Sequence, residues 1–487
     1  MQIRRIQVPD YRALRGIDLQ FDAAADPQLF PIGSENGGGK STLLQLVFVL
    51  LHCAGDEERA DFIRNLMASF HHPEDQAEKL LARFELWDGE ELHDIEFVSL
   101  GPKYLEDALG TALQDVGFEA IRKVKLLEQG IRRLKELFHL LSIQNPSPQD
   151  TTRVRQLLAH PAIVSSVSED RRRLIEQEYS ANRSRSAERK FNPLDLLEPL
   201  EDTDVDLADR VLHTIAAKND TYLTWYPEPS SETVRHALVA RTNGSTKRDI
   251  DSLLQRCRGS IFMLAPSSQP YLFLPPSSRK SFIATPPKPR DRSGKSQEST
   301  SVAYHKELEL ASRDLPGFFA YDWLSVAPLV ELFRQSRDQD FSEAVKTGNY
   351  GSAYTDMLKD LNALLCGKEV KPLEDLSGVQ FSIVGPDGAT RALGPEDLSR
   401  GELKRLMVYA WLKANQTDDA IVLMDELEVS FHPDWQYGVA KDLTEWAPKT
   451  QFLLATHSYD ICRAVTPAHV RELEPKLTDG GRGEPRS

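Results

Sequence analysis

The chain has few cysteines and no apolar run long enough to cross a membrane. Its four cysteines, at positions 53, 257, 366 and 462 of 487 residues, share no C-x-x-C spacing, so neither a zinc site nor a disulfide framework is indicated. The longest apolar run, residues 43–53 with one glutamine, is well short of a transmembrane helix of about 20 residues. The opening residues alternate charged and apolar side chains, unlike a signal peptide. We therefore expect a cytoplasmic protein with reduced cysteines and no membrane partner.

Acidic residues outnumber basic ones, 74 to 59, which gives a net charge of −15 and argues against a surface covered with nucleic-acid contacts. Basic residues nevertheless gather in one region. They are Arg122, Lys123, Lys125, Arg132, Arg133, Lys135, Arg171, Arg172, Arg173, Arg183, Arg185, Arg189 and Lys190, followed by an acidic tract at 198–209. Three interpretations stay open: a solvated face paired to the acidic tract, a DNA or RNA contact, and a docking face for a protein.

A glycine-rich segment, Ser34 to Thr42, lies between the apolar stretches 29–32 and 43–51. A strand that turns into a helix through such a segment is the setting of a P-loop. Its backbone N–H groups would surround phosphate oxygens, Lys40 would reach the β- and γ-phosphates, and Ser41 would offer its hydroxyl to Mg²⁺. The expected nucleotide-binding residues are Asn36, Gly37, Gly38, Gly39, Lys40, Ser41 and Thr42.

One position departs from the usual P-loop pattern. Ser34 stands where a glycine is expected, and Gly33 comes one place early. A serine forced to φ > 0 would cost about 1–2 kcal/mol. We therefore expect the backbone of the first turn of this loop to differ from that of the usual P-loop.

Three shorter motifs follow far downstream. The apolar run 421–424 ends in Asp425-Glu426, the apolar run 451–455 is followed by His457, and the turn 398–402, L-S-R-G-E, opens a helix at 403–413. Apolar strands that end in polar residues are typical of the ligand-binding edge of a parallel sheet. Each motif alone also fits an ordinary core strand or turn, so the evidence lies in their order.

In that order the motifs resemble those of ATP-binding-cassette (ABC) ATPases of the soluble RecF, SMC and OLD branch. Residues 3–21 resemble the opening strand, aromatic-Arg pair and second strand of that branch, and residues 425–433 resemble its Walker B motif and D-loop. The resemblance covers about 1–100 and 375–475 of the chain. It implies an α/β fold, in which a P-loop ABC ATPase head, a mixed sheet flanked by helices, carries a mostly α-helical insertion.

The resemblance also implies roles for single residues. Asp425 would hold Mg²⁺, Glu426 would activate the attacking water, and His457 would contact the γ-phosphate. Arg12 would contact the nucleotide, as would Ser399 and Gly401 from a neighbouring subunit. Gln269 is the candidate Q-loop glutamine for Mg²⁺ and the attacking water, with a surface loop glutamine as the alternative. The implied cofactors are ATP and Mg²⁺.

We divide the chain into seven segments. These are the N-terminal part of the head at 1–102, a helical insertion at 103–255, a head strand and Q-loop at 256–274, a linker rich in proline, serine and basic residues at 275–302, a helical lobe at 303–375, the C-terminal part of the head at 376–475, and a tail at 476–487. A hairpin is expected at 82–100, with its turn at Asp88-Gly89. Apolar residues at 124, 127, 131, 134, 138 and 141 follow a/d spacing, which fits a short coiled-coil hairpin or a plain bundle.

The expected function is that of an ATPase whose ATP-dependent head dimerisation controls a separate effector, a nuclease, in bacterial anti-phage defence. This expectation rests on a resemblance to the ATPase subunits of the PARIS and Septu systems. The alternative is a RecF-like repair or chromosome-maintenance ATPase that clamps DNA. The expected partners are a second copy of the chain, or a higher homo-oligomer, the effector, and nucleic acid bound only weakly or conditionally. A transporter energiser is disfavoured by the large insertions, and an OLD-type nuclease because residues 458–487 are too few for a Toprim domain.

Overall fold

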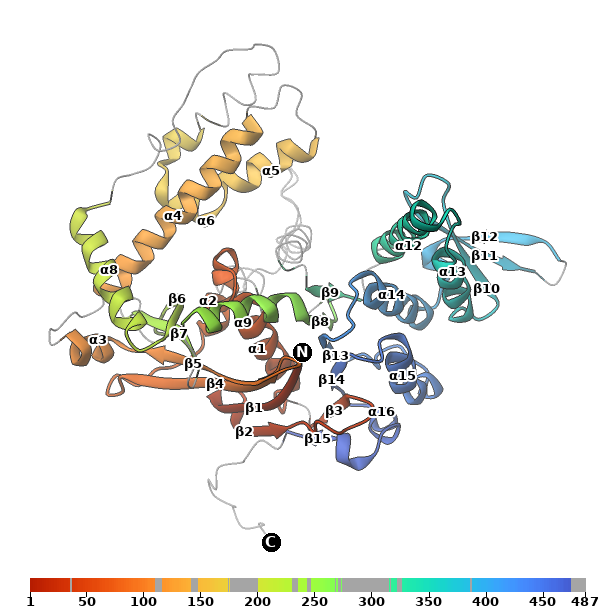
Figure 1. Ribbon diagram of the computed structural model, residues 1–487, viewed down its shortest axis with the longest axis horizontal. Coiled ribbons are helices and arrows are strands. Elements are labelled where there is room, and N and C mark those ends of the chain that lie inside the picture. Colours follow the sequence, from red (N-terminus) through yellow and green to blue (C-terminus); the bar gives the residue numbers. More distant parts are fainter. Residues whose placement is uncertain are drawn as a thin grey trace, which may run out of the picture. The chain divides into compact units, whose positions relative to one another are not determined.

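The structure is a computed structural model. It describes residues 1–35, 37–109, 116–141, 148–173, 175, 200–229, 235–242, 247–267, 269, 273, 315, 317–321, 326–385 and 388–473. They belong to two compact units: unit 1 comprises 1–67, 81–96 and 251–487, and unit 2 comprises 68–80 and 97–250. Both units combine strands with helices (Figure 1), so the α/β fold expected from the sequence is confirmed.

A parallel sheet forms the centre of unit 1. Its strands, in spatial order, are β15 (Arg471–Glu472), β3 (Leu29–Gly33), β14 (Gln451–Ala455), β13 (Ile421–Asp425), β8 (Ile261–Ala265) and β9 (Phe318–Ala320). Each neighbouring pair is parallel. The residues of β13 and β14 are all buried, as expected for strands covered on both faces.

Helices cover this sheet. Helix α1 (Lys40–Cys53) packs against β8, β13 and β14. Val422 and Met424 of β13 belong to an apolar cluster with α14 (Arg400–Ala414) and α15 (Pro433–Trp446). Alternate residues of a strand point to opposite faces, so α1 and the α14–α15 pair lie on opposite faces of the sheet, as Figure 1 also shows. The shorter helices of this part are α2 (Ala60–Met67) and α16 (Tyr459–Arg463), with 3₁₀ turns at Glu57–Arg59, Pro395–Asp397 and Pro467–His469.

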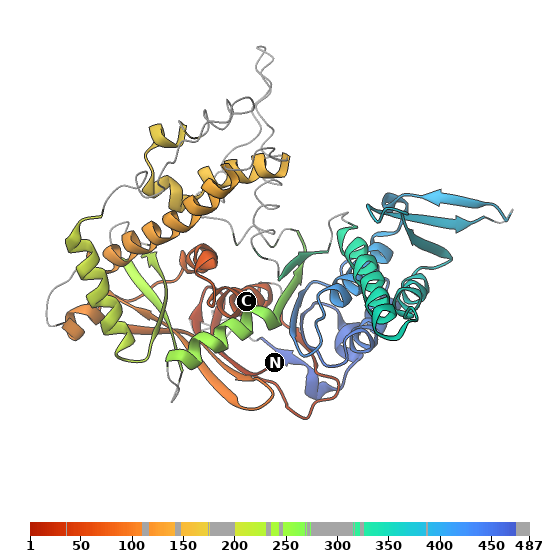
Figure 2. The same ribbon diagram turned by 45° about the horizontal axis from the view of Figure 1, so that its top comes forward.

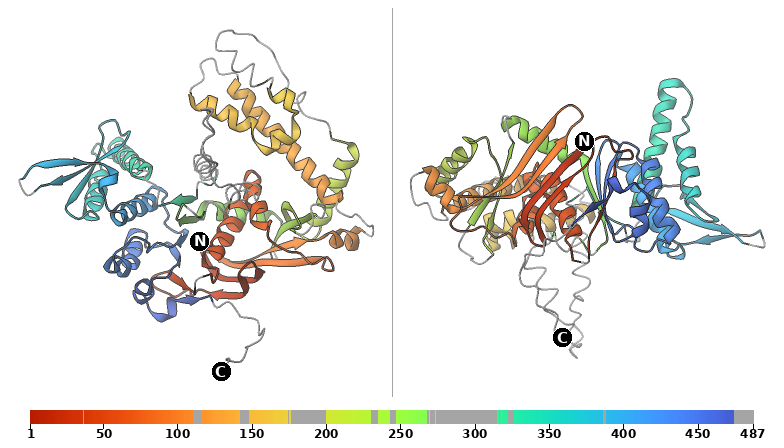
Figure 3. Two further views of the ribbon diagram at one scale, coloured as in Figure 1. Left: turned by 180° about the vertical axis from the view of Figure 1, so that it is seen from behind. Right: turned by 90° about the horizontal axis from the view of Figure 1, so that it is seen from below.

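An antiparallel sheet begins in unit 1 with β2 (Leu14–Gln20), β1 (Gln2–Tyr11), β4 (Glu78–Trp87) and β5 (Leu92–Leu100), in that order. Its red and orange strands lie side by side in Figure 3. Strands β4 and β5 form the hairpin expected at 82–100, and Gly89 at φ 108° makes its turn.

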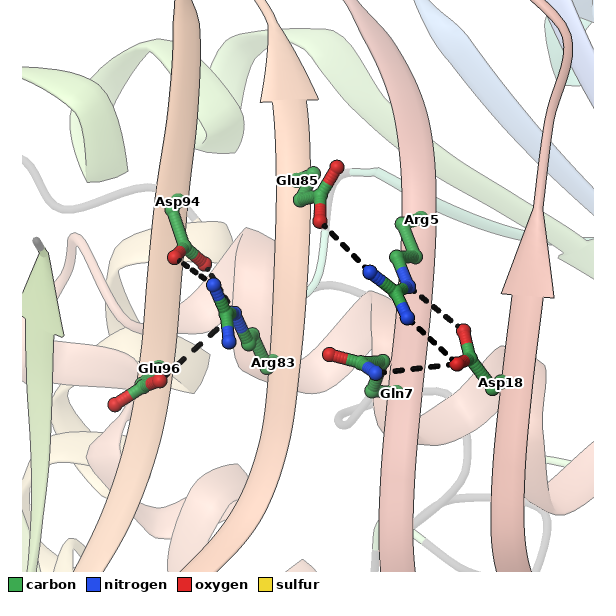
Figure 4. Close-up of polar contacts among 7 residues, drawn as sticks. All are labelled: Arg5, Gln7, Asp18, Arg83, Glu85, Asp94 and Glu96. Carbon is green, nitrogen blue, oxygen red and sulfur yellow. Dashed lines mark hydrogen bonds and ion pairs between the residues drawn. The ribbon is translucent and has the colours of Figure 1, made fainter.

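Charged residues bridge these four strands on one face, which we call the cross-strand ladder (Figure 4). Arg5 lies between Asp18, at 2.7 Å, and Glu85, at 3.4 Å. Arg83, on β4, pairs with Asp94 and Glu96, which both lie on β5. Opposite charges on neighbouring strands stabilise a sheet modestly, by about 0.2–1 kcal/mol per pair.

Unit 1 also contains a small lobe between β9 and α14. It comprises α12 (Ala327–Thr347), α13 (Ala353–Ala363) and an antiparallel sheet of β10 (Lys368–Pro372), β11 (Val379–Val384) and β12 (Thr390–Leu393). Figure 2 shows α12 and α13 packed together beside the three strands. The linker expected at 275–302 lies entirely outside the described residues.

Unit 2 contains α3 (Pro102–Leu109), α4 (Val116–Leu141), α5 (Pro148–Leu158), α6 (Pro161–Ser166) and α8 (Asp202–Ala216), and the antiparallel pair β6 (Thr221–Pro227) and β7 (Arg235–Thr242). Helix α9 (Lys247–Ser260) runs from this unit into unit 1. Helix α4 packs against α5, α6 and α8, and Leu134 and Leu137 are buried against Val154 and Leu157 of α5. The strands β6 and β7 were not expected in this interval.

Basic residues of α4 are paired with acidic neighbours. Lys123 lies 3.0 Å from Asp204 in the acidic tract, and Lys125 lies 3.4 Å from Glu128. Arg133 and Glu136 form a further pair within the helix. Among the described residues, no helix is both long and apolar enough to cross a membrane.

Candidate functional site

The carboxyl ends of three neighbouring parallel strands, β13, β14 and β3, meet at one edge of the unit 1 sheet. Asp425, the last residue of β13, stands opposite Ala455 of β14, and Ala455 stands opposite Ile32 of β3. The segments that follow these strands therefore emerge side by side. They carry the glycine-rich loop, the pair Asp425-Glu426 and His457, three motifs far apart in the sequence.

The glycine-rich loop has the backbone of a phosphate-binding turn. Gly37 and Gly39 have φ values of 81° and 91°, a region that side chains rarely occupy, and α1 begins directly after Gly39. An added Cβ at Gly39 would lie 2.7 Å from Cδ2 of Leu14, so the Leu14 side chain would have to shift. Ser34 does not have a positive φ, so the loop avoids the strain considered for that position. Asn36 lies outside the described residues.

Lys40 is almost completely buried at the start of α1, with 6% of its surface exposed. Its Nζ donates to the carbonyl and to Oγ of Ser34, at 3.0 and 2.9 Å, and lies 3.5 Å from Nδ1 of His457. Burial lowers the pKa of Lys40, although the nearby carboxylates, chiefly Asp425, favour its charged form. An anion placed at the loop would stabilise this charge.

Asp425 is buried among other acids, with 1% of its surface exposed. Burial raises its pKa to about 7; repulsion from Glu426 and Glu428 adds to the rise, while a hydrogen bond from Ser41 and the charge of Lys40 oppose it. Its Oδ2 atom is buried without a hydrogen-bond partner among the described residues. A carboxylate oxygen of this kind, beside a serine hydroxyl, is suited to bind a hard cation.

Glu428 is the residue of this site to which the sequence analysis gave no role. Its Oε1 accepts a 2.6 Å hydrogen bond from the backbone N–H of His457, so it joins the turn after β13 to the turn after β14. Its Oε2 is also buried without a partner in the described part of the chain. The signal available in the sequence was the run of three acids in four residues, 425–428.

These residues fit a Mg²⁺–nucleotide complex. The described residues contain no cluster of three or more His, Cys, Asp or Glu residues arranged to hold a metal ion. Mg²⁺ at phosphate sites does not need one, because it is held by one or two carboxylates together with phosphate oxygens and water. We call Lys40, Ser41, Asp425, Glu426, Glu428 and His457 the candidate site.

Glu426 lies in a strained turn at the end of β13. Its φ is 50°, and its N–H donates to the carbonyl of Ala455 at 3.0 Å. His457, on the neighbouring turn, is exposed. Both residues therefore lie at the sheet edge where the sequence analysis expected them, next to Asp425 and Lys40 respectively.

Ser399 and Gly401 lie at the start of α14. Ser399 is exposed and caps the helix: its hydroxyl accepts from the N–H of Glu402 at 3.2 Å, and its own N–H donates to the Glu402 carboxylate. Gly401 is buried, and a Cβ there would lie 2.8 Å from the carbonyl oxygen of Ser430. Among the described residues, no hydrogen bond links either residue to the glycine-rich loop of the same chain.

Three other residues were expected at the site, Arg12, Gln269 and Thr42. Arg12, at φ 53° in the turn between β1 and β2, donates to the carbonyl of Leu66 at 3.4 Å. Gln269 accepts a hydrogen bond from the amide of Gln45, which lies one turn after Ser41 on α1. Thr42 is half-buried in the first turn of α1. The structure thus places Gln269 beside α1, the helix that follows the glycine-rich loop, where it is hydrogen-bonded to Gln45.

Part of the chain matches a known protein family. Residues 285–463 match the family model described as "AAA domain, putative AbiEii toxin, Type IV TA system". This interval contains Ser399, Asp425, Glu426 and His457, but not the glycine-rich loop. In this interval the chain is similar to an AAA-family ATPase domain.

Three solved structures of SMC heads are also similar to this chain. The SMC head bound to the C-winged helix domain of ScpA is 10% identical, with 96% of this chain and 93% of that chain covered and a TM-score of 0.38. The head with an extended coiled coil bound to the C-terminal domain of ScpA, from Pyrococcus furiosus, is 11% identical over 95% and 91%, with a TM-score of 0.31. The head with a coiled coil and joint from Pyrococcus yayanosii is 11% identical over 95% and 93%, with a TM-score of 0.32.

Proposed function

We propose that this chain binds ATP with Mg²⁺ at the candidate site and hydrolyses it to ADP and phosphate. The observation that carries the proposal is the convergence of Lys40, Asp425 and His457 at one sheet edge. Buried oxygens of Asp425 and Glu428 there have no hydrogen-bond partner in the described part of the chain. When bound, Mg²⁺ would supply positive charge against the phosphate oxygens. Ser41 and Asp425 would hold it, and Lys40 would turn from Ser34 toward the phosphates.

Glu426 would orient the attacking water and accept its proton, and His457 would contact the γ-phosphate. The direct test compares Glu426→Gln with the wild-type protein in ATP binding and in steady-state hydrolysis. We expect nucleotide affinity to be kept and kcat to fall by about 100-fold or more, since the water loses its base. An unchanged kcat would refute the assignment of Glu426.

We further propose that two copies pair through their heads, with Ser399 and Gly401 of each copy facing the nucleotide of the other. The exposed cap of α14, with its helix N-terminus, suits an anion brought by a second subunit. The residues 430–432 of the turn that follows the site would lie at the seam. Release of phosphate would then open the pair, so that the output is conformational.

A mixing experiment tests this arrangement. Ser399→Asp keeps a good helix cap but places a negative charge against the phosphate, while Ser399→Asn is a neutral cap of the same size. Ser399→Asp should be nearly inactive and Ser399→Asn should keep most of its activity. A mixture of Ser399→Asp with Lys40→Ala should regain activity, because one site of each mixed pair is intact. A mixture as inactive as its parents would contradict action between subunits.

We propose that the ATPase controls a separate effector, a nuclease, in anti-phage defence, and that it acts in the cytoplasm. Support comes from the matched family model, whose description names a putative toxin of a type IV toxin–antitoxin system. The alternative, a RecF-like clamp on DNA, receives less support, because basic residues of α4 are already paired with Asp204, Glu128 and Glu136.

Duplex binding separates the two functions. We expect weak binding that disappears near physiological salt, as net charge −15 opposes a polyanion. The measurement is the affinity for a labelled duplex at about 50 and 150 mM salt, with and without ATP. Tight, ATP-dependent binding at the higher salt would favour the clamp. A nuclease that copurifies with ATP-trapped Glu426→Gln but not with Lys40→Ala would favour the effector.

A further inference from the structure

The turn after β13 has an unusual backbone. Glu426 and Ser430, neither of them glycine, have φ values of 50° and 75°. Such conformations cost about 1–3 kcal/mol each and persist only where the surroundings hold them. The turn therefore needs a support outside its own residues, and that support would fix the direction of the Glu426 side chain.

Lys404 on α14 provides such a support. It is buried, with 5% of its surface exposed, and its Nζ donates to the carbonyls of Glu426 and Val429 at 3.1 and 3.0 Å. The same Nζ lies 3.9 Å from the ring centroid of Tyr321, and the Tyr321 hydroxyl donates to the carbonyl of Asp425. Lys404 and Tyr321 thus hold three carbonyls of one turn, and we call this pair the carbonyl clamp.

The chemistry of the clamp suits a buried backbone. An ammonium group has three donors and no acceptor, so it can satisfy several carbonyls at once. A cation over an aromatic ring, away from water, gains about 2 kcal/mol. Helix α14 also packs directly against the other end of the turn, because its Gly401 lies against the carbonyl oxygen of Ser430. The first turns of α14 are therefore joined to the turn that carries Glu426.

We propose that Lys404 is a positioning residue for ATP hydrolysis, which fixes Glu426 toward the attacking water and couples its position to the start of α14. The proposal rests on the ATPase function proposed above. Lys404 contacts backbone atoms of the turn through its Nζ, so its loss should move the base while the phosphate-binding loop stays in place. The expected signature is a fall in kcat with little change in nucleotide affinity.

The test compares Lys404→Met with Lys413→Met. Lys413 lies on the same helix, donates to the carbonyl of Trp446 at 2.6 Å and lies 5.9 Å from the Tyr409 ring, so it makes the same kinds of contact elsewhere. Displacing a catalytic group by about 1 Å can cost about 100-fold in rate, and we expect a loss of about that size for Lys404→Met. Nucleotide Kd should stay within about threefold. Lys413→Met should keep its kcat, and Lys404→Arg, which retains charge and donors, should recover part of the loss.

Two further variants keep the proposal open to refutation. In the Glu426→Gln background, Lys404→Met should lower the rate only slightly, because both changes act on the same step. Lys404→Gln, which removes the charge and keeps a shorter polar side chain, serves if Lys404→Met does not fold, and should lower kcat with unchanged Kd. An inactive wild-type protein would sink the proposed ATPase. If the wild type is active, an unchanged kcat in Lys404→Met, or in Lys404→Gln where that variant stands in, would overturn the role of Lys404 alone. Additive losses in the double variant would overturn it as well.

Discussion

The candidate site and the cross-strand ladder of unit 1 have similar charges in opposite surroundings. The ladder sets Arg5 and Arg83 against four carboxylates on a partly exposed sheet face (Figure 4). The candidate site sets Lys40 against three carboxylates, those of Asp425, Glu426 and Glu428. In both places the acidic side chains outnumber the basic ones by two. The two surroundings nevertheless shift the pKa of an acid in opposite directions.

In the ladder, the side chain of Asp18 is 42% exposed, and two hydrogen bonds from Arg5 lower its pKa. In the site, Asp425 is 1% exposed and burial raises its pKa to about 7. The difference teaches that pairing in water favours a charged acid, whereas burial among other acids opposes it. A protein keeps the second arrangement at a cost in stability, and such costs are typical of binding and catalytic sites.

The largest expected difference between the two regions concerns nucleotide binding. Lys40→Ala should weaken ATP binding by about 100-fold or more, because it removes a buried cation that would face the phosphates. Arg5→Ala removes a cation from the ladder and should leave the affinity unchanged. The measurement is titration with a fluorescent ATP analogue. Equal losses in both variants would mean that the loop is not the nucleotide site.

The second prediction concerns stability and has opposite signs in the two regions. Asp425→Asn removes a buried charge while its carbonyl can still accept from Ser41, so with EDTA at pH 8 it should stabilise the protein by about 2–4 kcal/mol. Asp18→Asn removes an exposed, paired charge and should destabilise by less than about 1 kcal/mol. Urea unfolding gives both values. Destabilisation by Asp425→Asn would contradict the view that this acid is held at a cost.

The third prediction uses pH to sharpen the same contrast. A raised folded pKa means that the cost of Asp425 is present above pH 7 and shrinks as pH falls. The advantage of Asp425→Asn should therefore fall by about 1 kcal/mol per unit between pH 7 and 5. The lowered pKa of Asp18 predicts a constant effect of Asp18→Asn over that range. Unfolding curves for the three proteins at pH 5, 6, 7 and 8 give the slopes.

Of the two regions compared, only the buried one, the candidate site, could be predicted from the sequence. The motifs around Lys40, Asp425 and His457 indicated the site because parallel strands bring their carboxyl ends to one edge whatever the distance in sequence. The α/β fold was implied by the family resemblance that these motifs carry. The strands β6 and β7 were missed because their residues lie between helical segments in an interval that looked helical throughout.

Other contacts have no local signal in the sequence. Lys404 is one lysine in a helix, and only the packing of α14 against the turn after β13 shows that it holds carbonyls. Glu428 was visible as an acid, but its bond to the His457 N–H depends on two strands 30 residues apart being neighbours. The ladder depends on cross-strand register in the same way, since the register sets Arg5 opposite Glu85 and diagonal to Asp18.

The smallest expected effect belongs to the ladder itself. Arg83→Ala removes the partner of Asp94 and Glu96, but these side chains are partly exposed and water can solvate them. We expect destabilisation of less than about 1 kcal/mol, smaller still at high salt, with no change in ATP affinity or kcat. Urea unfolding at about 50 and 500 mM salt, with Arg83→Lys as the charge-preserving control, measures it. A loss comparable to the effect of Asp425→Asn, or any loss of hydrolysis, would show that the ladder is more than an exposed set of ion pairs and would remove the contrast between the two regions.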